Sequence, residues 1–132
     1  MNKYGYIYSG NYTNQVKYGI TKIGMTQIAP SARRSNIESK SGHKFRMRRY
    51  IRIENITKED LLFVESWVRR EMARIDGLTY EENSNDHFTF IIEKGNKFDQ
   101  FDNFADLAMK FAMDALVFMG YDLAKTKIKN CQ

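Results

Sequence analysis

Residues 4–26 of the chain read YGYIYSGNYTNQVKYGITKIGMT, and this stretch decides the fold that we expect. Residues 4–9 are rich in aromatic side chains and residues 16–24 contain several β-branched ones, which favours a strand in each case. Between the two strands lie residues typical of turns, namely Gly10, Asn11 and Asn14. Two strands with a short polar connection predict an antiparallel hairpin.

A short helix is expected after the hairpin, over Ser31 to Lys40. Pro30 suits its first turn, because the backbone donor that proline lacks would have no helical partner there. Gly42 is a typical residue just beyond a helix end. The sequence therefore predicts that this helix ends before the next strand begins.

Residues 45–53 alternate in the manner of a strand. One side is expected to hold the apolar residues, with Arg49 as the exception: Phe45, Met47, Ile51 and Ile53. The other side is expected to present three arginines and a tyrosine in a row on one surface: Arg46, Arg48, Tyr50 and Arg52. A solvent-facing edge strand kept soluble by its charge is the alternative interpretation.

Residues 58–75 predict an amphipathic helix. Thr57 suits the N-cap position and Asp60 stands at the third helical position, as in an acidic form of the capping box. The predicted buried stripe consists of Leu61, Val64, Val68, Met72 and Ile75. Glu65 lies beside this stripe, so its carboxylate either flanks the core at the helix surface or points into a cleft.

The remaining elements are a strand at His87 to Ile92 and a long helix from about Asn103 to Met119. The expected class is α+β, with a small antiparallel central sheet of about three to four strands, flanking helices and an extra C-terminal helix. We expect residues 1–94 to form one domain. Residues 95–132 would be a helical extension that packs on this domain or mediates assembly.

The charge of the chain is unevenly distributed. The net charge is +5, but residues 33–52 contain eight basic residues and one acid, a net +7, so the rest of the chain carries −2. Lysine and arginine release condensed counterions from a phosphate backbone, so this basic block predicts a polyanionic partner. A solvated charged face is the alternative.

Other function classes are disfavoured by composition. No apolar run approaches the ~20 residues needed to span a bilayer, and the first residues lack the apolar core of a signal peptide, so we expect a cytoplasmic protein without membrane contact. The single cysteine, Cys131, cannot form an internal disulfide. With only His43 and His87 beside it, a structural zinc site is not expected.

Four short motifs or residues follow one another along the chain in the order of a known family: residues 5–8 (GYIY), residues 22–26 (KIGMT), Arg33 and Glu65. Together they resemble the GIY-YIG nuclease superfamily. The closer similarity is to its phage and mobile-element branch, in which the second tripeptide reads Lys-Ile-Gly and is followed by Met-Thr. The resemblance covers roughly residues 4–92.

The resemblance implies a DNA endonuclease, a hydrolase that cleaves phosphodiesters with the help of a divalent metal and leaves a 5′-phosphate and a 3′-hydroxyl. It implies catalytic roles for Tyr8, Lys22 and Arg33. Glu65 would be the metal ligand and would hold one Mg²⁺ or Mn²⁺. A tyrosine near a metal and a lysine can act as a base or orient water, and arginine matches the geometry of phosphate.

Some positions depart from the family pattern. Ile37 and Arg69 stand where many members carry histidine, and Lys22 replaces the usual tyrosine. Tyr18 could stand in for that tyrosine if the echo at residues 17–19 were the true second motif, but the spacing to Arg33 would then be five residues too long, so Lys22 is preferred. Secondary site candidates are Tyr6, Tyr18, Arg34, His43, Arg69 and His87. Candidate DNA-binding residues are Arg34, Lys44, Arg46, Arg48, Arg49 and Arg52.

Two other functions stay open from the sequence. One is a catalytically inactive DNA-binding module on the same fold, as the missing histidines suggest. The other is a protein-interaction subunit whose C-terminal helix mediates assembly. For both the endonuclease and the DNA-binding module, the partner would be DNA, expected to be double-stranded. A homodimer is a further possibility.

Overall fold

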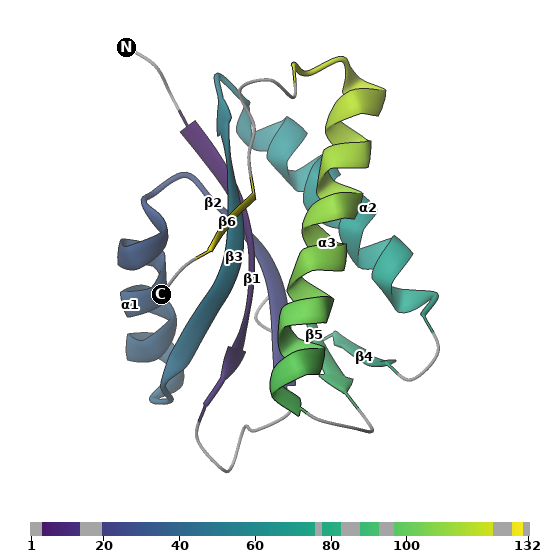
Figure 1. Ribbon diagram of the computed structural model, residues 1–132. Helices are drawn as coiled ribbons and strands as arrows, with labels where there is room; N and C mark the ends of the chain where they lie inside the picture. The colour runs from purple at the N-terminus through teal and green to yellow at the C-terminus, as the bar shows by residue number, and fades with distance from the viewer. Residues whose placement is uncertain are drawn as a thin grey trace.

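The central sheet is antiparallel throughout and is flanked by helices, so the predicted α+β class is confirmed (Figure 1). The computed structural model describes residues 4–13, 20–75, 78–82, 88–92, 97–122 and 128–130. The strands are β1 (Tyr4–Tyr12), β2 (Ile20–Thr26), β3 (Phe45–Glu54), β4 (Leu78–Glu82), β5 (Phe88–Ile92) and β6 (Ile128–Asn130). The helices are α1 (Pro30–Ser41), α2 (Lys58–Ala73) and α3 (Lys97–Met119).

The six strands lie in the order β4-β5-β2-β1-β3-β6. β1 and β2 form the predicted antiparallel hairpin, with Tyr8 opposite Gly24. The sheet is wider than the three to four strands expected, because the short strands β4 and β6 extend its two edges. β6 has only three residues, too few for a recognisable pattern. β4 reads LTYEE, and its first four residues alternate in the manner of a strand, but it was not among the predicted elements.

The C-terminal end of β1 differs from the prediction, because the strand continues to Tyr12. Gly10 and Asn11, expected in the turn, belong to the strand and pair with Lys22 and Thr21. Gly10 serves a packing purpose there, since a Cβ at this position would lie 2.7 Å from Cζ of Phe45 and closer still to the backbone oxygen of Arg46. The glycine is therefore explained by the close approach of the β3 backbone and of this ring, and not by a turn.

Helix α1 covers one face of the sheet, and α2 and α3 lie together on the other face (Figure 1). The larger core lies on the α2/α3 face, where Ile7, Ile23 and Ile51 pack against both helices. α3 contributes a row of small and long side chains to this core: Phe104, Ala108, Met109, Ala112, Ala115 and Leu116. A smaller core lies under α1 and consists of Tyr8, Tyr12, Ile37, Phe45 and Met47.

The alternation predicted for residues 45–53 is wrong at one point. The pairing of β1 with β3 shifts between Ser9, opposite Arg49, and Gly10, opposite Met47, so Arg48 is an extra residue in a bulge. The bulge exchanges the faces of the strand. Phe45 and Met47 consequently pack under α1, whereas Ile51 and Ile53 pack under α2 and α3.

The ends of α1 and the start of α2 follow the sequence signals, whereas α3 begins at Lys97 and not at about Asn103 as predicted. Oγ1 of Thr57 accepts a 3.1 Å hydrogen bond from the backbone N–H of Asp60, which confirms the predicted N-cap of α2. The stripe Leu61, Val64, Val68 and Met72 is buried as predicted. Pro30 lies in the first turn of α1, and Gly42 ends this helix with a φ of 72°, a conformation that favours glycine. None of the helices in the described part of the chain has the length and apolar character needed to cross a membrane.

Candidate functional site

Tyr8 is the centre of a buried polar site on the α1 face of the sheet. Its side chain is fully buried and lies across Gly24 of the neighbouring strand. A Cβ at position 24 would lie 2.5 Å from Cζ of Tyr8 and closer still to its hydroxyl oxygen. Glycine at this position is therefore what allows the tyrosine ring to lie against β2.

Arg33 reaches this tyrosine from the first turn of α1. Its Nε–H donates a 3.2 Å hydrogen bond to the Tyr8 hydroxyl oxygen. Burial raises the pKa of Tyr8 above its usual 10.0, and the charge and hydrogen bond of Arg33 oppose that increase. The phenol is thus protonated at neutral pH, and its O–H remains available to orient another group.

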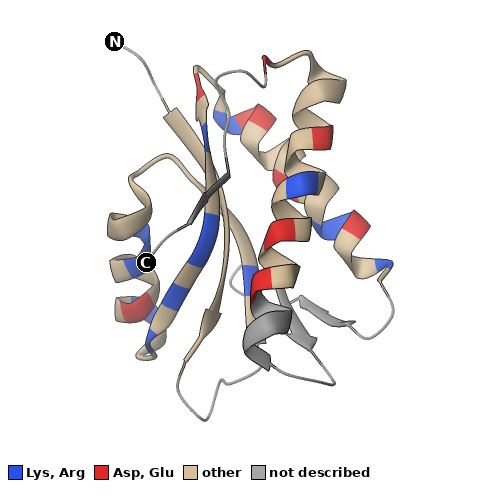
Figure 2. Cartoon of the chain, viewed as in Figure 1, with Lys and Arg blue, Asp and Glu red and all other residues tan. Residues whose placement is uncertain are grey.

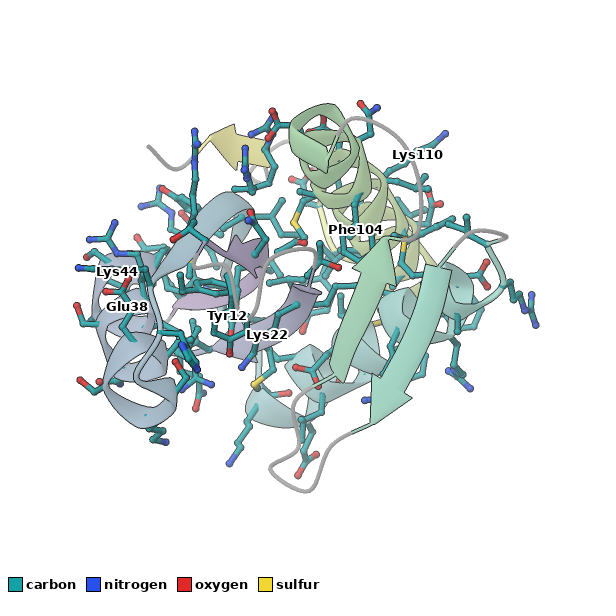
Figure 3. The ribbon with its side chains drawn as sticks, turned by 90° about the horizontal axis from the view of Figure 1, so that it is seen from below. Tyr12, Lys22, Glu38, Lys44, Phe104 and Lys110 are labelled. Carbon is teal, nitrogen blue, oxygen red and sulfur yellow. The ribbon has the colours of Figure 1, made fainter. Side chains whose placement is uncertain are left out.

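Lys22 lies on the same face of the sheet. It is opposite Gly10 in the hairpin, two residues before Gly24, so its side chain projects to the side that holds Tyr8. The side chain is buried, and burial lowers the pKa of its amine to about 7, an effect to which the Arg33 charge adds and which Glu65 opposes. In Figure 3, Lys22 and Tyr12 lie between α1 and the β4–β5 pair.

Glu65 comes from α2, on the other side of the sheet, and reaches the site around the edge of β2. The pairing of β2 with β5 ends at Ile23, and beyond that point the Met25 backbone donates a hydrogen bond to the Glu65 carboxylate. Burial raises the pKa of Glu65, while Arg69, Lys22, this hydrogen bond and Arg33 oppose the rise, in that order of size. The carboxylate is therefore within electrostatic reach of both Lys22 and Arg33.

The structure thus brings the four principal candidates together, although they are distant in the sequence. The charges of Arg33 and Glu65 each shift the pKa of Tyr8 and the pKa of Lys22. The groups present are a neutral phenol, an amine that titrates near neutrality, a guanidinium and a carboxylate. Such a set can bind a phosphate, hold a cation and move a proton.

The secondary candidates are scattered. Arg69 lies one turn after Glu65 on α2 and influences its carboxyl more than any other charge does. Tyr6 lies on the same face as Tyr8 and is partly exposed. His43 packs edge-on against the Tyr12 ring, with ring centroids 6.4 Å apart. Tyr18 and His87 lie outside the described residues.

Tyr12 belongs to the site and was not among the predicted residues. Burial raises the pKa of its hydroxyl, and a hydrogen bond with Ser41 and the charge of Arg33 oppose that effect. The charge interaction with Tyr12 also raises the pKa of Tyr8. The available signal was strand alternation, which places residue 12 on the face of residue 8, but the glycine and asparagine between them indicated a turn instead.

The predicted row of arginines on β3 is wrong. Arg48 is only 4% exposed, and its guanidinium binds Asn11 at 2.8 Å and Asp102 of α3 at 3.3 Å. Arg49 binds Asp106 of α3 at 2.8 Å. Arg48 faces α3 as the bulge residue, and Arg49 does so because it alternates with Ile51 on that face. Figure 2 shows basic residues on β3 and acidic residues on α3.

The other predicted DNA-binding residues have different surroundings. Lys44, Arg46 and Arg52 are exposed, and Lys44 lies at the α1 side of the molecule, far from Lys110 of α3 in Figure 3. Arg34 is partly buried, and its Nε has no hydrogen-bond partner among the residues that the structure describes. The DNA-binding role of all these residues remains a prediction.

A metal at this site would depend on one protein carboxylate. Within the described ranges, no three His, Cys, Asp or Glu side chains gather to hold a metal ion. Glu65 fits a site of the Mg²⁺ type nonetheless, because that ion binds through one or two carboxylates and completes its coordination with water and substrate phosphate. Arg69 and Lys22 beside it are cations that would compete with the ion.

No family model, curated protein or solved structure matches this chain. A functional assignment therefore has to be argued from the site itself.

Proposed function

We propose that the protein is a divalent-metal-dependent DNA endonuclease of the phage or mobile-element type, a hydrolase of phosphodiester bonds. The observation that supports it is the proximity of four side chains: Arg33 is hydrogen-bonded to Tyr8, and Lys22, Arg33 and Glu65 lie close enough to shift one another's pKa values or those of their neighbours. Each residue type has a role in phosphodiester hydrolysis, which needs a positioned water, a proton acceptor and compensation of phosphate charge.

Tyr8 and Lys22 divide the proton chemistry between them. Because burial raises its pKa, Tyr8 is a poor base at neutral pH and is better suited to orient water through its O–H. Lys22, with a pKa of about 7, is partly neutral at the same pH and can accept a proton. We therefore assign water positioning to Tyr8 and proton acceptance to Lys22.

Arg33 and Glu65 handle the phosphate and the cation. The Arg33 guanidinium keeps donors beyond the one bound to Tyr8, and they suit two phosphate oxygens at once. Glu65 would hold a single Mg²⁺ or Mn²⁺. When bound, the ion would supply Lewis-acid stabilisation of the leaving oxygen.

The experiment is a plasmid-nicking assay with purified protein in Mg²⁺ or Mn²⁺. Glu65→Gln and Tyr8→Phe should each abolish nicking while the far-ultraviolet circular dichroism stays unchanged. Glu59→Gln, an exposed acid in the first turn of the same helix, is the matched control and should nick normally. If the wild-type protein cleaves no form of DNA with either ion, the endonuclease proposal fails.

A catalytically inactive DNA-binding module is the second candidate. The observation that favours it is the position of Arg69 and Lys22, two cations that act on the lone carboxylate and disfavour a bound metal. This function predicts salt-dependent DNA binding without nicking. Unchanged affinity after substitution of the exposed Arg46 and Arg52 by glutamine would count against it.

A further inference from the structure

An open tyrosine surface lies beside the buried site, on the same face of the sheet. We call it the tyrosine platform, and it consists of Tyr4, Tyr6, Tyr50 and Arg52. In the β1–β3 pairing Tyr6 is opposite Arg52 and Tyr8 is opposite Tyr50, so these side chains project to one side. The three tyrosines are partly exposed and Arg52 is exposed.

Helix α1 defines where the platform begins. The single buried residue of the helix, Ile37, packs with Tyr8, Tyr12 and neighbouring side chains, and Tyr50 only borders that cluster. The face is therefore covered by α1 up to Tyr8. Beyond Tyr8, towards the start of β1, Tyr4, Tyr6 and Tyr50 are partly exposed, and no helix of the described part of the chain lies over them.

The rings of the platform are partly exposed and lie close to one another and to Arg52. Tyr6 and Tyr50 have ring centroids 6.1 Å apart and are tilted by 59°, and the Arg52 guanidinium lies 4.7 Å above the Tyr4 ring. Tyrosine rings and arginine planes are the groups on which unpaired bases stack. An acid, Glu54, lies opposite Tyr4 at the end of the face furthest from Tyr8.

The platform is continuous with the site. Tyr6 precedes Tyr8 by one side-chain repeat, about 7 Å along the strand, which one nucleotide can span. A DNA strand whose phosphate lies at Arg33, next to Tyr8, would therefore bring an adjacent base over Tyr6 and Tyr50. The faces of bases within a duplex are occupied by their neighbours, so only an unpaired base could stack there.

We propose that the tyrosine platform binds unpaired nucleotides of a DNA strand next to the phosphate held at Arg33. The substrate class would then be DNA with unpaired bases at the cleaved position, as in a single strand or a junction, in place of the double-stranded DNA expected from the sequence. This proposal rests on the endonuclease function proposed above, and its test is a binding experiment that needs no cleavage.

The test measures fluorescence anisotropy of a labelled thymidine oligonucleotide of about 12 nucleotides, within the usual range of single-strand site sizes, and of a duplex of equal length, both in EDTA. Tyr6→Leu and Tyr50→Leu should each weaken single-strand binding by about fivefold or more, as expected for the loss of one stacked base. The Kd for the duplex should change by less than about twofold, which is well below the ~1.4 kcal/mol that a tenfold change in affinity represents. Phe118→Leu, an exposed aromatic of α3, is the control and should change neither.

Three outcomes would overturn the platform: no measurable single-strand binding by the wild-type protein, no effect of either substitution, or equal losses on both DNA forms. Thermal unfolding of each variant establishes that the fold is retained. The two proposals fail separately. If the variants lose single-strand binding selectively but the wild-type protein shows no Mg²⁺-dependent nicking, only the endonuclease proposal is refuted. If the wild-type protein nicks DNA but both variants bind single strands as it does, only the platform is refuted.

Discussion

Arg33 and Tyr8 are joined by a 3.2 Å hydrogen bond that connects the first turn of α1 to the middle of β1. The guanidinium is the donor, so the tyrosine keeps its own proton. The contact holds the Arg33 guanidinium beside the Tyr8 hydroxyl, and Gly24 lies next to the same phenol on β2.

Substitution of Arg33 tests the link directly. Arg33→Lys keeps the positive charge but removes the planar set of donors, so we expect nicking to fall by a factor of about 10² to 10³, as for one lost transition-state donor. Nicking rates in Mg²⁺ measure this. Arg70→Lys, exposed on α2, is the control, and equal rates for the two variants would contradict the assigned role.

Gly24→Ala should disturb Tyr8. A Cβ at this position meets the tyrosine ring at 2.5 Å, so the ring must move, and we expect a loss of about 1–3 kcal/mol in the free energy of unfolding. Denaturant titration measures it. In a Tyr8→Leu background the same substitution should cost less, because the contacting ring is gone. Equal costs in both backgrounds would show that the strain lies elsewhere.

Lys22 should make stability depend on pH. Its pKa is about 7 in the folded protein and 10.5 when unfolded, so the unfolded chain binds more protons between these values. The free energy of unfolding should therefore rise with pH across this window, by up to ~1.4 kcal/mol per pH unit. Tyr8, whose pKa is raised from 10.0, adds an opposite slope only above pH 10.

Denaturant titrations of the metal-free protein between pH 7 and pH 10 would measure this slope. Lys22→Met keeps an unbranched side chain of similar length in the same buried place and removes the amine. The slope should then largely disappear. A variant with the wild-type slope would show that another group titrates in this range.

The ion pair between β3 and α3 should contribute to stability. Arg48 is almost wholly buried, whereas Asp102 is 42% exposed, so Asp102→Asn should cost about 1–2 kcal/mol after allowance for solvent screening. Thermal or denaturant unfolding measures the loss. Asp114→Asn, an exposed acid further along the same helix, should be neutral, and an equal effect of the two substitutions would contradict the specific role of the pair.

Local patterns in the chain were sufficient to predict the β1–β2 hairpin, the capped helix α2 with its buried stripe, and the α+β class. These features depend on interactions between residues close in sequence, such as the bond from Asp60 to Thr57 and the spacing of Leu61, Val64 and Val68. Periodicity and capping chemistry report such interactions directly.

The bulge at Arg48, the membership of Tyr12 in the site and the pairing of Arg48 and Arg49 with α3 depended on the tertiary structure. An extra residue in one strand reverses the faces of everything beyond it, and no local signal marks where it occurs. The acids that engage these arginines lie more than fifty residues later in the chain. Only packing of α3 on the sheet brings them together, because a charge pair across such a distance exists only once the fold has formed.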